Sequence, residues 1–261
     1  MACTALIHKM DAISDLRADD VVRLRQLCLN VTRTTRFCDI ISQGDRPLAV
    51  HLIIDGWAAR YTILPDGQRQ ITAFLMPGDF CDLHIPILRE MDHGIMALTK
   101  CAYACVDLDS LQDLTTDNPG LAVALSRLTL IDEAILRQWI VNVGRRDAGQ
   151  AIAHLFCELK ARADMAGISH GPSMPLPLTQ EVLADATGIT PVHANRTIQA
   201  LRHQGMIRLE SGRLTILDRD RLQQLGGFDA SYLHLKAAPI KAAMGRAGIT
   251  ASDASRVASQ S

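Results

Sequence analysis

The chain has 261 residues, enough for one or two domains, and its 48% hydrophobic and 21% charged residues support a sizeable core and argue against global disorder. The formal net charge of -1 gives no sign of a nucleic-acid partner for the chain as a whole, so any basic surface must be local. The absence of a stretch of about 18 apolar residues argues against a membrane span, and the first residues do not fit a secretory signal peptide.

Apolar residues at helical spacing between residues 11 and 29 predict short N-terminal helices. From about residue 36 to 112, glycines recur every 11 to 12 residues in turn-like pairs, and the segments between them alternate. Short strands between regular turns predict a closed β-roll, with a generic antiparallel sheet as the alternative. The pairs are Gly44-Asp45, Asp55-Gly56, Asp66-Gly67 and Pro77-Gly78.

The period becomes helical from Leu121 to Val143, with an apolar stripe that Asp132 interrupts. So long a stripe, with no second seam nearby to cover it, predicts a helix that pairs with a copy of itself. The alternative is that this face packs on the roll. Gly144 to Asp147 is a candidate hinge, because glycine readily ends helices. The stripe consists of Leu121, Leu125, Leu128, Ile135, Trp139 and Asn142.

Two helices joined by a tight turn are predicted next, after a proline-rich stretch over residues 171–178 that cannot be helical. Thr179 is a good N-cap, and Gly188 permits the turn. Thr190 caps the second helix and Pro191 takes its first position, where the missing N–H costs nothing. This spacing is typical of a helix-turn-helix, with an ordinary helical hairpin as the alternative.

Residues 206–217 follow as two short strands around Ser211-Gly212, a hairpin that makes the arrangement winged. Asp218 is placed to cap a short last helix. The segment beyond about residue 228 is rich in Ala and Ser and has few large apolar residues, so we expect it to be mobile.

The predicted fold class is therefore α+β. We expect the chain to divide into N-terminal helices and a β-roll over 1–118, a dimerisation helix over 119–144, a winged helix-turn-helix over 145–227 and a mobile tail over 228–261.

Local charge supports DNA binding, because the segment between residues 189 and 213 contains four arginines and only one acidic residue, Glu210. Early positions of the second helix would face base edges, where Arg196 can read a guanine and Asn195 an adenine. Val192 offers only a methyl contact. The candidate DNA-binding residues are Thr179, Gln180, Thr190, Val192, His193, Asn195, Arg196 and Arg202, of which Thr179, Gln180 and Arg202 are better placed for phosphates.

A β-roll, a long helix, a hinge and a winged helix-turn-helix in this order resemble the Crp/Fnr family of bacterial transcription regulators. The resemblance covers roughly residues 20 to 227 and is carried by 77-PGDF-80, 178-LTQEVLADATGITPVHANRTIQALRHQGMI-207 and 212-GRLTILDRDRL-222. It implies a homodimer on a near-palindromic site in double-stranded DNA, with the roll sensing a signal and the long helices relaying it. An activator of this family would also contact RNA polymerase.

The recognition helix departs from the family pattern at one position. Val192 stands where the family usually has a Glu that accepts from cytosine, whereas Arg196 keeps the family's guanine-reading Arg. The usual half-site therefore cannot be carried over to this chain.

The sensor departs as well. Family members that bind cyclic nucleotides have a Gly-Glu after the Gly-Asp-Phe turn and an Arg-Ser about ten residues later, where this chain has Asp82-Leu83 and His93-Gly94. A buried phosphate without a strong cation partner is costly, so tight binding of cyclic AMP is not expected, although Arg89 lies near in sequence. The candidate effector-pocket residues are Cys81, Asp82, His84, Arg89 and His93.

The cysteines bear on the other sensor options. The seven are scattered, odd in number and without a Cys-x-x-Cys pair, which favours reduced thiols in a cytoplasm over a disulfide framework and gives no metal site from neighbouring ligands. The segment 81-CDLH-84 resembles the haem-binding turn of the family's carbon-monoxide sensors, though with different spacing. Haem, a structural thiol, a redox thiol and an unknown ligand stay open. Cys3 and Cys28 are too sparse for an iron–sulfur cluster, and Cys101 and Cys105 are read as packed small hydrophobes.

Two rival functions have weaker support. No nucleophile elbow, phosphate loop or metalloprotease helix is present, and a catalytic pair of Cys81 with His84 or His93 has no further support, so we do not expect an enzyme. The alternative function is a ligand-binding or interaction protein whose winged helix no longer reads DNA.

Overall fold

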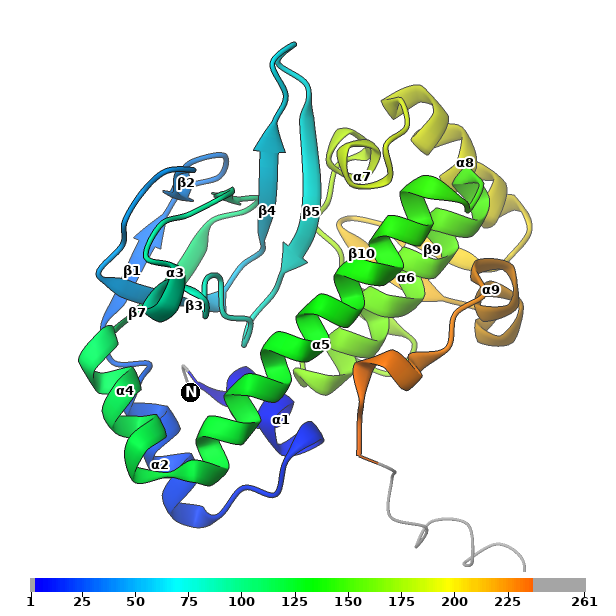
Figure 1. The fold of residues 1–261 in the computed structure, drawn as a ribbon. Helices are drawn as coiled ribbons and strands as arrows, with labels where there is room; N and C mark the ends of the chain where they lie inside the picture. The colour runs from blue at the N-terminus through cyan, green and yellow to red at the C-terminus, as the bar shows by residue number, and fades with distance from the viewer. Residues whose placement is uncertain (1–2, 237–261) are drawn as a thin grey trace, which may run out of the picture.

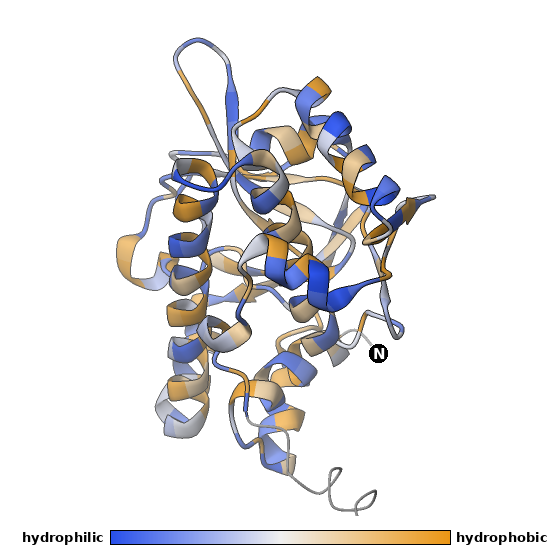
Figure 2. Cartoon of the chain, turned by 90° about the vertical axis from the view of Figure 1, so that its right-hand side faces the viewer, coloured by the Kyte–Doolittle hydropathy of each residue, from blue (hydrophilic) through white to orange (hydrophobic). Residues whose placement is uncertain are grey.

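The computed structural model describes residues 3–236 and shows an N-terminal β-roll with helices at one end, a long helix along its side and a compact C-terminal lobe (Figure 1). Hydrophobic and hydrophilic segments alternate along the helices, as expected for elements with one buried face (Figure 2). The predicted α+β fold is therefore confirmed.

The roll consists of two antiparallel sheets in the strand orders β1-β7-β3 and β2-β6-β4-β5. The predicted glycine turns lie between its strands. At one of them Gly56 has φ +83°, and a Cβ there would lie 2.3 Å from the carbonyl oxygen of Lys100, so only glycine fits. The elements are β1 (Val31–Thr34), β2 (Asp39–Ile41), β3 (Ala49–Asp55), β4 (Ala58–Ile63), β5 (Arg69–Leu75), α3 (Ile85–Leu88), β6 (Gly94–Ala97) and β7 (Cys101–Asp107).

Helices before and after the roll close its lower end (Figure 1). α5 starts where the Asn118 side chain accepts a hydrogen bond from the backbone N–H of Leu121, with Pro119 as its first residue. These helices are α1 (Thr4–Ile13), α2 (Ala18–Gln26), α4 (Leu108–Asp117) and α5 (Pro119–Gly144).

The C-terminal lobe follows α5 after a short connection and packs on the roll. Phe74 of β5 meets Trp139 of α5 edge to face, with ring centroids 5.4 Å apart, in a hydrophobic core that continues through Phe156 into the lobe. Its elements are α6 (Ala148–Met165), β8 (Ser173–Pro175), α7 (Gln180–Thr187), α8 (Pro191–His203), β9 (Ile207–Glu210), β10 (Arg213–Ile216), α9 (Arg219–Gly226) and a 3-10 helix η1 (Ala230–Leu233).

The stripe predicted to pair α5 with a second copy is the wrong one. Leu121, Ile135 and Trp139 are 1%, 5% and 4% exposed, because they pack inside the protomer, as the alternative interpretation held. The exposed apolar residues lie on other sides of the helix, so periodicity identified the buried stripe but not what covers it. These residues are Val123, Leu130, Leu136, Ile140, Val141 and Val143.

The prediction of a mobile tail from residue 228 is wrong for residues 228–236. Tyr232 stacks on His154 of α6 with ring centroids 6.0 Å apart, Leu233 is fully buried, and Lys236 forms an ion pair of 2.7 Å with Asp15. A few well-placed apolar and aromatic residues dock this segment despite its Ala- and Ser-rich composition. Residues 237–261 of the predicted tail lie outside the described part of the chain.

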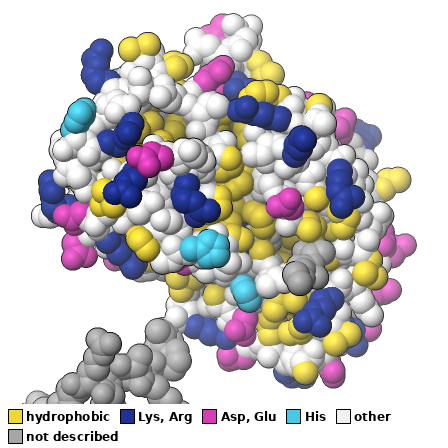
Figure 3. All heavy atoms as spheres, turned by 180° about the vertical axis from the view of Figure 1, so that it is seen from behind, with side chains coloured by type: hydrophobic (Ala, Val, Ile, Leu, Met, Phe, Trp, Pro, Cys, Tyr) yellow, Lys and Arg dark blue, Asp and Glu magenta, His cyan; other side chains and the backbone are white. Residues whose placement is uncertain are grey.

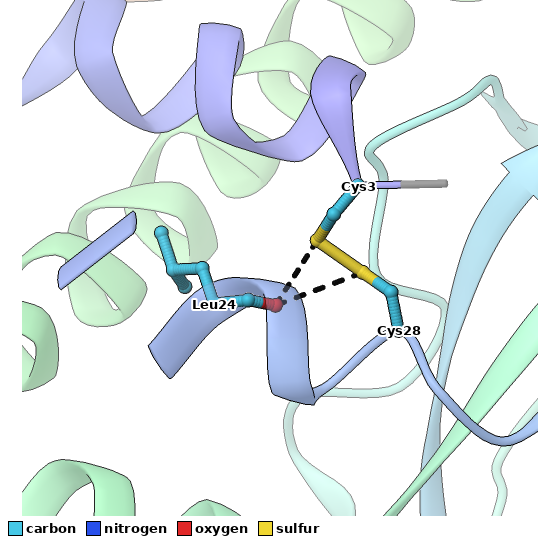
Figure 4. The surroundings of a disulfide bond; sticks show 3 residues. All are labelled: Cys3, Leu24 and Cys28. Carbon is cyan, nitrogen blue, oxygen red and sulfur yellow. Dashed lines mark hydrogen bonds between the residues drawn. A yellow bond between two sulfur atoms is a disulfide. The ribbon is translucent and has the colours of Figure 1, made fainter. Parts of the chain in front are cut away.

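The expectation that all cysteines are reduced is also wrong for one pair. Cys3 and Cys28 form a disulfide between the start of α1 and the end of α2 (Figure 4). The sequence separation of 25 residues gave no sign of this, because the packing of the two helices brings the cysteines together. The other five cysteines are free.

Candidate nucleic-acid interface and effector cavity

The helix-turn-helix is held by the caps that the sequence predicted. Thr179 Oγ1 accepts from the backbone N–H of Val182 and Thr190 Oγ1 from that of His193, both at 3.2 Å. Gly188 ends α7 with φ +68°, a left-handed conformation that glycine adopts without strain. These local contacts fix the angle at which α8 leaves the turn.

One face of α8 packs on the lobe and the other is exposed. Ala194, Ile198 and Leu201 are buried, which seats the helix on α6 and α7. Val192 is 69% exposed, and the side chains of His193 and Arg196 are exposed beside it. We call the outward residues Val192, His193, Asn195 and Arg196 the reading face.

Asn195 differs from its neighbours on the reading face. It is half-buried, and its Oδ1 accepts a 2.9 Å hydrogen bond from Nε2 of Gln180 at the start of α7. The structure thus joins a candidate base-reading residue to a candidate phosphate-binding residue. Arg202 is exposed and lies about two helical turns after Asn195, where it donates a 3.3 Å hydrogen bond to the side chain of Gln199.

The lobe that carries α8 has a basic surface. Arg208 and Arg213 on the two strands of the wing are exposed, as are Arg196 and Arg202. Seen from behind, Lys and Arg side chains are frequent on this lobe, on the left of Figure 3. A local positive surface is what a phosphate backbone requires, even though the whole chain is nearly neutral.

A cavity of about 390 Å³ lies between the roll, α1, α5 and α6, and we call it the effector cavity. Arg60 of β4 spans one wall, donating from Nε to the carbonyl oxygen of Cys81 at 3.1 Å and pairing with Asp132 of α5. Burial opposes the charge, but the Asp132 carboxylate raises the pKa of Arg60. The polar residue that interrupts the α5 stripe therefore ties the long helix to the roll.

The effector cavity brings together two of the five candidate pocket residues. The rings of His84 and His93 lie with centroids 5.7 Å apart, and the buried Nε2 of each has no hydrogen-bond partner among the described residues. Nδ1 of His93 lies 2.5 Å from the Asp92 carboxylate. Burial nevertheless lowers the pKa of His93, so the neutral imidazole is favoured.

The other three candidates lie elsewhere. Cys81 is fully buried, and burial raises its pKa well above the ordinary value, so its thiolate is disfavoured. Asp82 is also fully buried, where it accepts from the backbone N–H of His51 at 2.7 Å. Arg89 lies on the exposed surface at the end of α3, with φ +63°.

Sequence reasoning missed a set of buried charges beside the cavity, which we call the junction network: Lys9, Asp79, Arg162 and Glu158. The Asp79 carboxylate accepts from Lys9 of α1 at 2.5 Å and from Arg162 of α6 at 3.0 Å, and Arg162 also pairs with Glu158 at 3.2 Å. Asp79 lies in the quoted PGDF turn, but nothing near Lys9 or Arg162 in sequence indicated their partner.

The positive and negative charges of the junction network stabilise one another. Burial alone would raise the pKa of Asp79, yet the charges of Lys9 and Arg162 hold it below its ordinary value. Burial lowers the pKa of Lys9 and raises that of Glu158. Three elements of the chain are thereby joined at one carboxylate.

A second polar contact holds the lobe against the roll. Arg69 of β5 pairs with Asp185 of α7 at 2.7 Å, and Gln70 Nε2 donates to the backbone carbonyl of Asp185 at 2.8 Å. The helix-turn-helix is thus docked on the β4–β5 hairpin, with the exposed side chains of the reading face still outward.

Two kinds of feature are absent from residues 3–236. No helix in this range combines the length and apolar character that crossing a bilayer requires. No group of three or more His, Cys, Asp or Glu in the same range is arranged to hold a metal ion.

Both parts of the chain match known domains. Residues 150–225 match the Crp-like helix-turn-helix domain, and residues 36–118 match the cyclic nucleotide-binding domain. The transcriptional activator protein FnrL of Cereibacter sphaeroides is 31% identical over 196 residues, which cover 73% of this chain and 78% of that protein. The nitrogen fixation regulation protein FixK of Bradyrhizobium diazoefficiens is 27% identical over 71% of this chain and 77% of that protein.

Solved structures share the fold. The structure of FixK2 from Bradyrhizobium japonicum aligns with a TM-score of 0.69 at 22% identity, covering 77% of this chain and 98% of that one. A CooA mutant from Carboxydothermus hydrogenoformans aligns with a TM-score of 0.59 at 18% identity, covering 76% of this chain and 87% of that one.

Proposed function

The chain belongs to the Crp/Fnr family of DNA-binding transcriptional regulators, and from this premise we propose that its homodimer binds a near-palindromic site in double-stranded DNA through the reading face of α8. The observation that carries the proposal is the exposed side of the first two turns of α8, a helix that is capped by Thr190 and followed by a basic wing. A helix presented in this way enters the major groove with its N-terminal residues at the base edges.

Each residue of the reading face has a proposed role. Arg196 donates to guanine O6 and N7, and Val192 packs on a thymine methyl group. Asn195 is held by Gln180, so that its amide keeps one orientation toward an adenine. His193 helps to set the remaining preference. Thr179, Gln180 and Arg202 contact phosphates and fix the register.

The homodimer forms through exposed apolar residues of α5, one of which, Leu136, also lines the effector cavity. Leu136, Ile140 and Val143 follow one another at spacings of four and three residues, and they are 45%, 61% and 51% exposed in the protomer. Such spacing forms a seam between two parallel helices. Two-fold pairing would then place two copies of α8 on successive half-sites.

The effector cavity is the proposed signal site, and its charge disfavours a cyclic nucleotide. Arg60 is already neutralised by Asp132, while Lys9 and Arg162 are bound to Asp79. The cavity lining carries three cations and four carboxylates, so a phosphate ester would be repelled. We therefore propose a neutral or cationic effector. The lining residues that carry charge are Lys9, Arg60, Arg162, Asp79, Asp92, Asp132 and Glu133.

The other cofactor options have less support. Burial of Cys81 disfavours the thiolate that would bind haem or react as a redox thiol. The same property makes Cys81 a poor catalytic nucleophile, so we propose no enzymatic role. A cytoplasmic regulator that contacts RNA polymerase as an activator is in keeping with the activator named among its relatives.

Selection from random duplexes tests the proposal. The full chain should enrich a motif with two-fold symmetry, whose half-sites lie about one helical turn apart. Failure to enrich any motif at low salt would contradict DNA reading and favour the alternative of an interaction protein with a winged helix. Native mass spectrometry of the same preparation should show the dimer and any retained effector.

A further inference from the structure

The disulfide between Cys3 and Cys28 ties the first turn of α1 to the end of α2 (Figure 4). Their Cα atoms lie 5.8 Å apart, a separation that a disulfide spans readily. The carbonyl oxygen of Leu24 lies 3.0 Å from Cys3 Sγ and 3.7 Å from Cys28 Sγ. It is therefore placed to accept a hydrogen bond from the Cys3 thiol once the disulfide is opened, so the site accommodates both redox states.

α1 packs directly on the turn that borders the effector cavity. Gly78 is so close to the first turn of α1 that a Cβ there would lie 2.7 Å from the backbone carbon of Ala5. One helical turn later, Lys9 reaches Asp79 of the same roll turn at 2.5 Å. The position of α1 therefore determines whether Lys9 can reach Asp79 in the junction network.

α1 also touches the elements that lead to the DNA-binding lobe. Asp79 links Lys9 to Arg162 of α6, and a Cβ on Gly167, just after α6, would lie 2.3 Å from Nδ1 of His8. Arg127 of α5 donates to the carbonyl oxygen of Ile13 at the end of α1. A ten-residue helix thus bridges the roll, the long helix and the lobe, and the disulfide holds its first turn.

We propose that Cys3–Cys28 is a redox-active site whose reactant is a dithiol reductant, and that opening it loosens α1 and with it the docked DNA-binding lobe. The proposal rests on the proposed function, because its biological output is DNA binding. α1 is a short helix whose first turn can fray, which would expose a sulfur that is buried in the closed state.

The exchange is balanced as follows. One thiolate of the reductant attacks a sulfur of the disulfide, forms a mixed disulfide and releases the other cysteine as a thiolate. The second thiolate of the reductant attacks the other reductant sulfur, which is bonded to the protein in the mixed disulfide, and releases the remaining cysteine as a thiolate. Two electrons pass to the protein, two protons yield the Cys3 and Cys28 thiols, and the reductant leaves as its disulfide. A disulfide oxidant reverses both steps.

The oxidised form is the one with higher DNA affinity. It fixes α1, and through Asp79 and Arg162 it holds α6 against the roll while the reading face stays exposed. In the reduced form the lobe must be ordered again on binding, which costs affinity. We expect the dissociation constant for the selected duplex to rise by roughly fivefold or more on reduction, the lower end of common coupling between sites.

The test uses the full chain, air-oxidised or reduced with dithiothreitol. Peptide mass spectrometry after alkylation first measures whether Cys3 and Cys28 are linked. Hydrogen exchange should then show that α1 and α6 lose protection on reduction, and duplex titration should show the loss of affinity. The proposal is overturned if the two cysteines stay fully alkylated after oxidation, or if the link forms and both protection and affinity are unchanged.

Two variants locate the effect. Cys28→Ser should behave like the reduced protein under both conditions. Cys38→Ser removes an exposed free thiol and should keep the full redox response. A response that survives Cys28→Ser, or that disappears in Cys38→Ser, would assign the effect to another thiol and overturn the proposal.

Failure of the proposed function is distinguishable from failure of the switch. If no duplex binds in either redox state, DNA reading fails, but hydrogen exchange still reports on α1. Redox-dependent protection of α1 and α6 would then support the switch, and equal protection would overturn it.

Discussion

The reading face of α8 and the effector cavity are built from different kinds of neighbours. Residues of the reading face are adjacent in sequence and largely exposed, and two local caps position them. The cavity and the junction network combine buried side chains from the roll, α1, α5 and α6. Substitutions on the reading face should therefore weaken DNA binding and leave the free energy of unfolding unchanged. Substitutions in the junction network should lower the free energy of unfolding.

The largest effect is expected for Asp79→Ala in the junction network. The substitution leaves Lys9 and Arg162 buried without their shared carboxylate, and breaking a buried pair in this way costs about 3–5 kcal/mol. Denaturant unfolding measures the loss, with the exposed Asp113→Ala as the matched control. A loss of less than about 1 kcal/mol in the free energy of unfolding would show that the network contributes no more than a surface ion pair.

Ile140→Ala tests a surface that is exposed in the protomer and buried in the proposed dimer. Two Ile side chains, one from each protomer, would lose roughly 1.5 kcal/mol of burial each, so the dimer should weaken by about 3 kcal/mol. Sedimentation equilibrium measures this change. Ile87→Ala, on the roll at 82% exposure, is the control and should leave dimerisation unchanged. Equal behaviour of the two variants would contradict the α5 seam.

His154 provides a pH-dependent test of the lobe. Burial among Phe228 and Tyr232, together with the nearby Arg146 charge, lowers its pKa to about 4. Between about pH 6.5 and that value the unfolded chain binds the proton and the folded chain does not, so stability falls as pH falls. The contribution is at most about 3 kcal/mol, since one pKa unit is worth 1.36 kcal/mol.

Unfolding of His154→Gln from pH 7 to pH 4 measures that contribution. The variant should lose part of the acid destabilisation, whereas the exposed His170→Gln should follow the wild type. If the wild type and His154→Gln have parallel stability curves, His154 does not titrate as its burial implies.

The smallest change in free energy is expected for two exposed arginines of α8. Arg196→Ala should relax specificity at one base position by about 1–3 kcal/mol, and Arg202→Ala should weaken binding to all duplexes alike and reduce the salt slope by about 1. Neither should shift the unfolding midpoint, because both side chains are exposed. Identical binding profiles for the two variants would show that the division into base and phosphate contacts is wrong.

The parts of the site that the sequence predicted are those whose conformation is set by residues a few positions away in the chain. Thr190 and Pro191 start α8 whatever packs around it, and Gly188 permits the turn through its own backbone. The prediction that this stripe pairs α5 with a second copy was wrong, because a helical period identifies an apolar face but not the element that packs on it. Trp139 of the stripe packs on Phe74 of the same protomer. Asp132 was visible as an interruption, but its partner Arg60 lies 72 residues away.

Local sequence was thus sufficient for the order of the elements, the caps and turn of the helix-turn-helix and the residues presented by α8, since each depends on backbone preferences of neighbouring residues. Only the packed chain decided which face of α5 is free, that Lys9 and Arg162 share Asp79, that residues 228–236 dock on α6 and that Cys3 meets Cys28. Those contacts join segments that are distant in sequence, and their free energy depends on burial that exists only after folding.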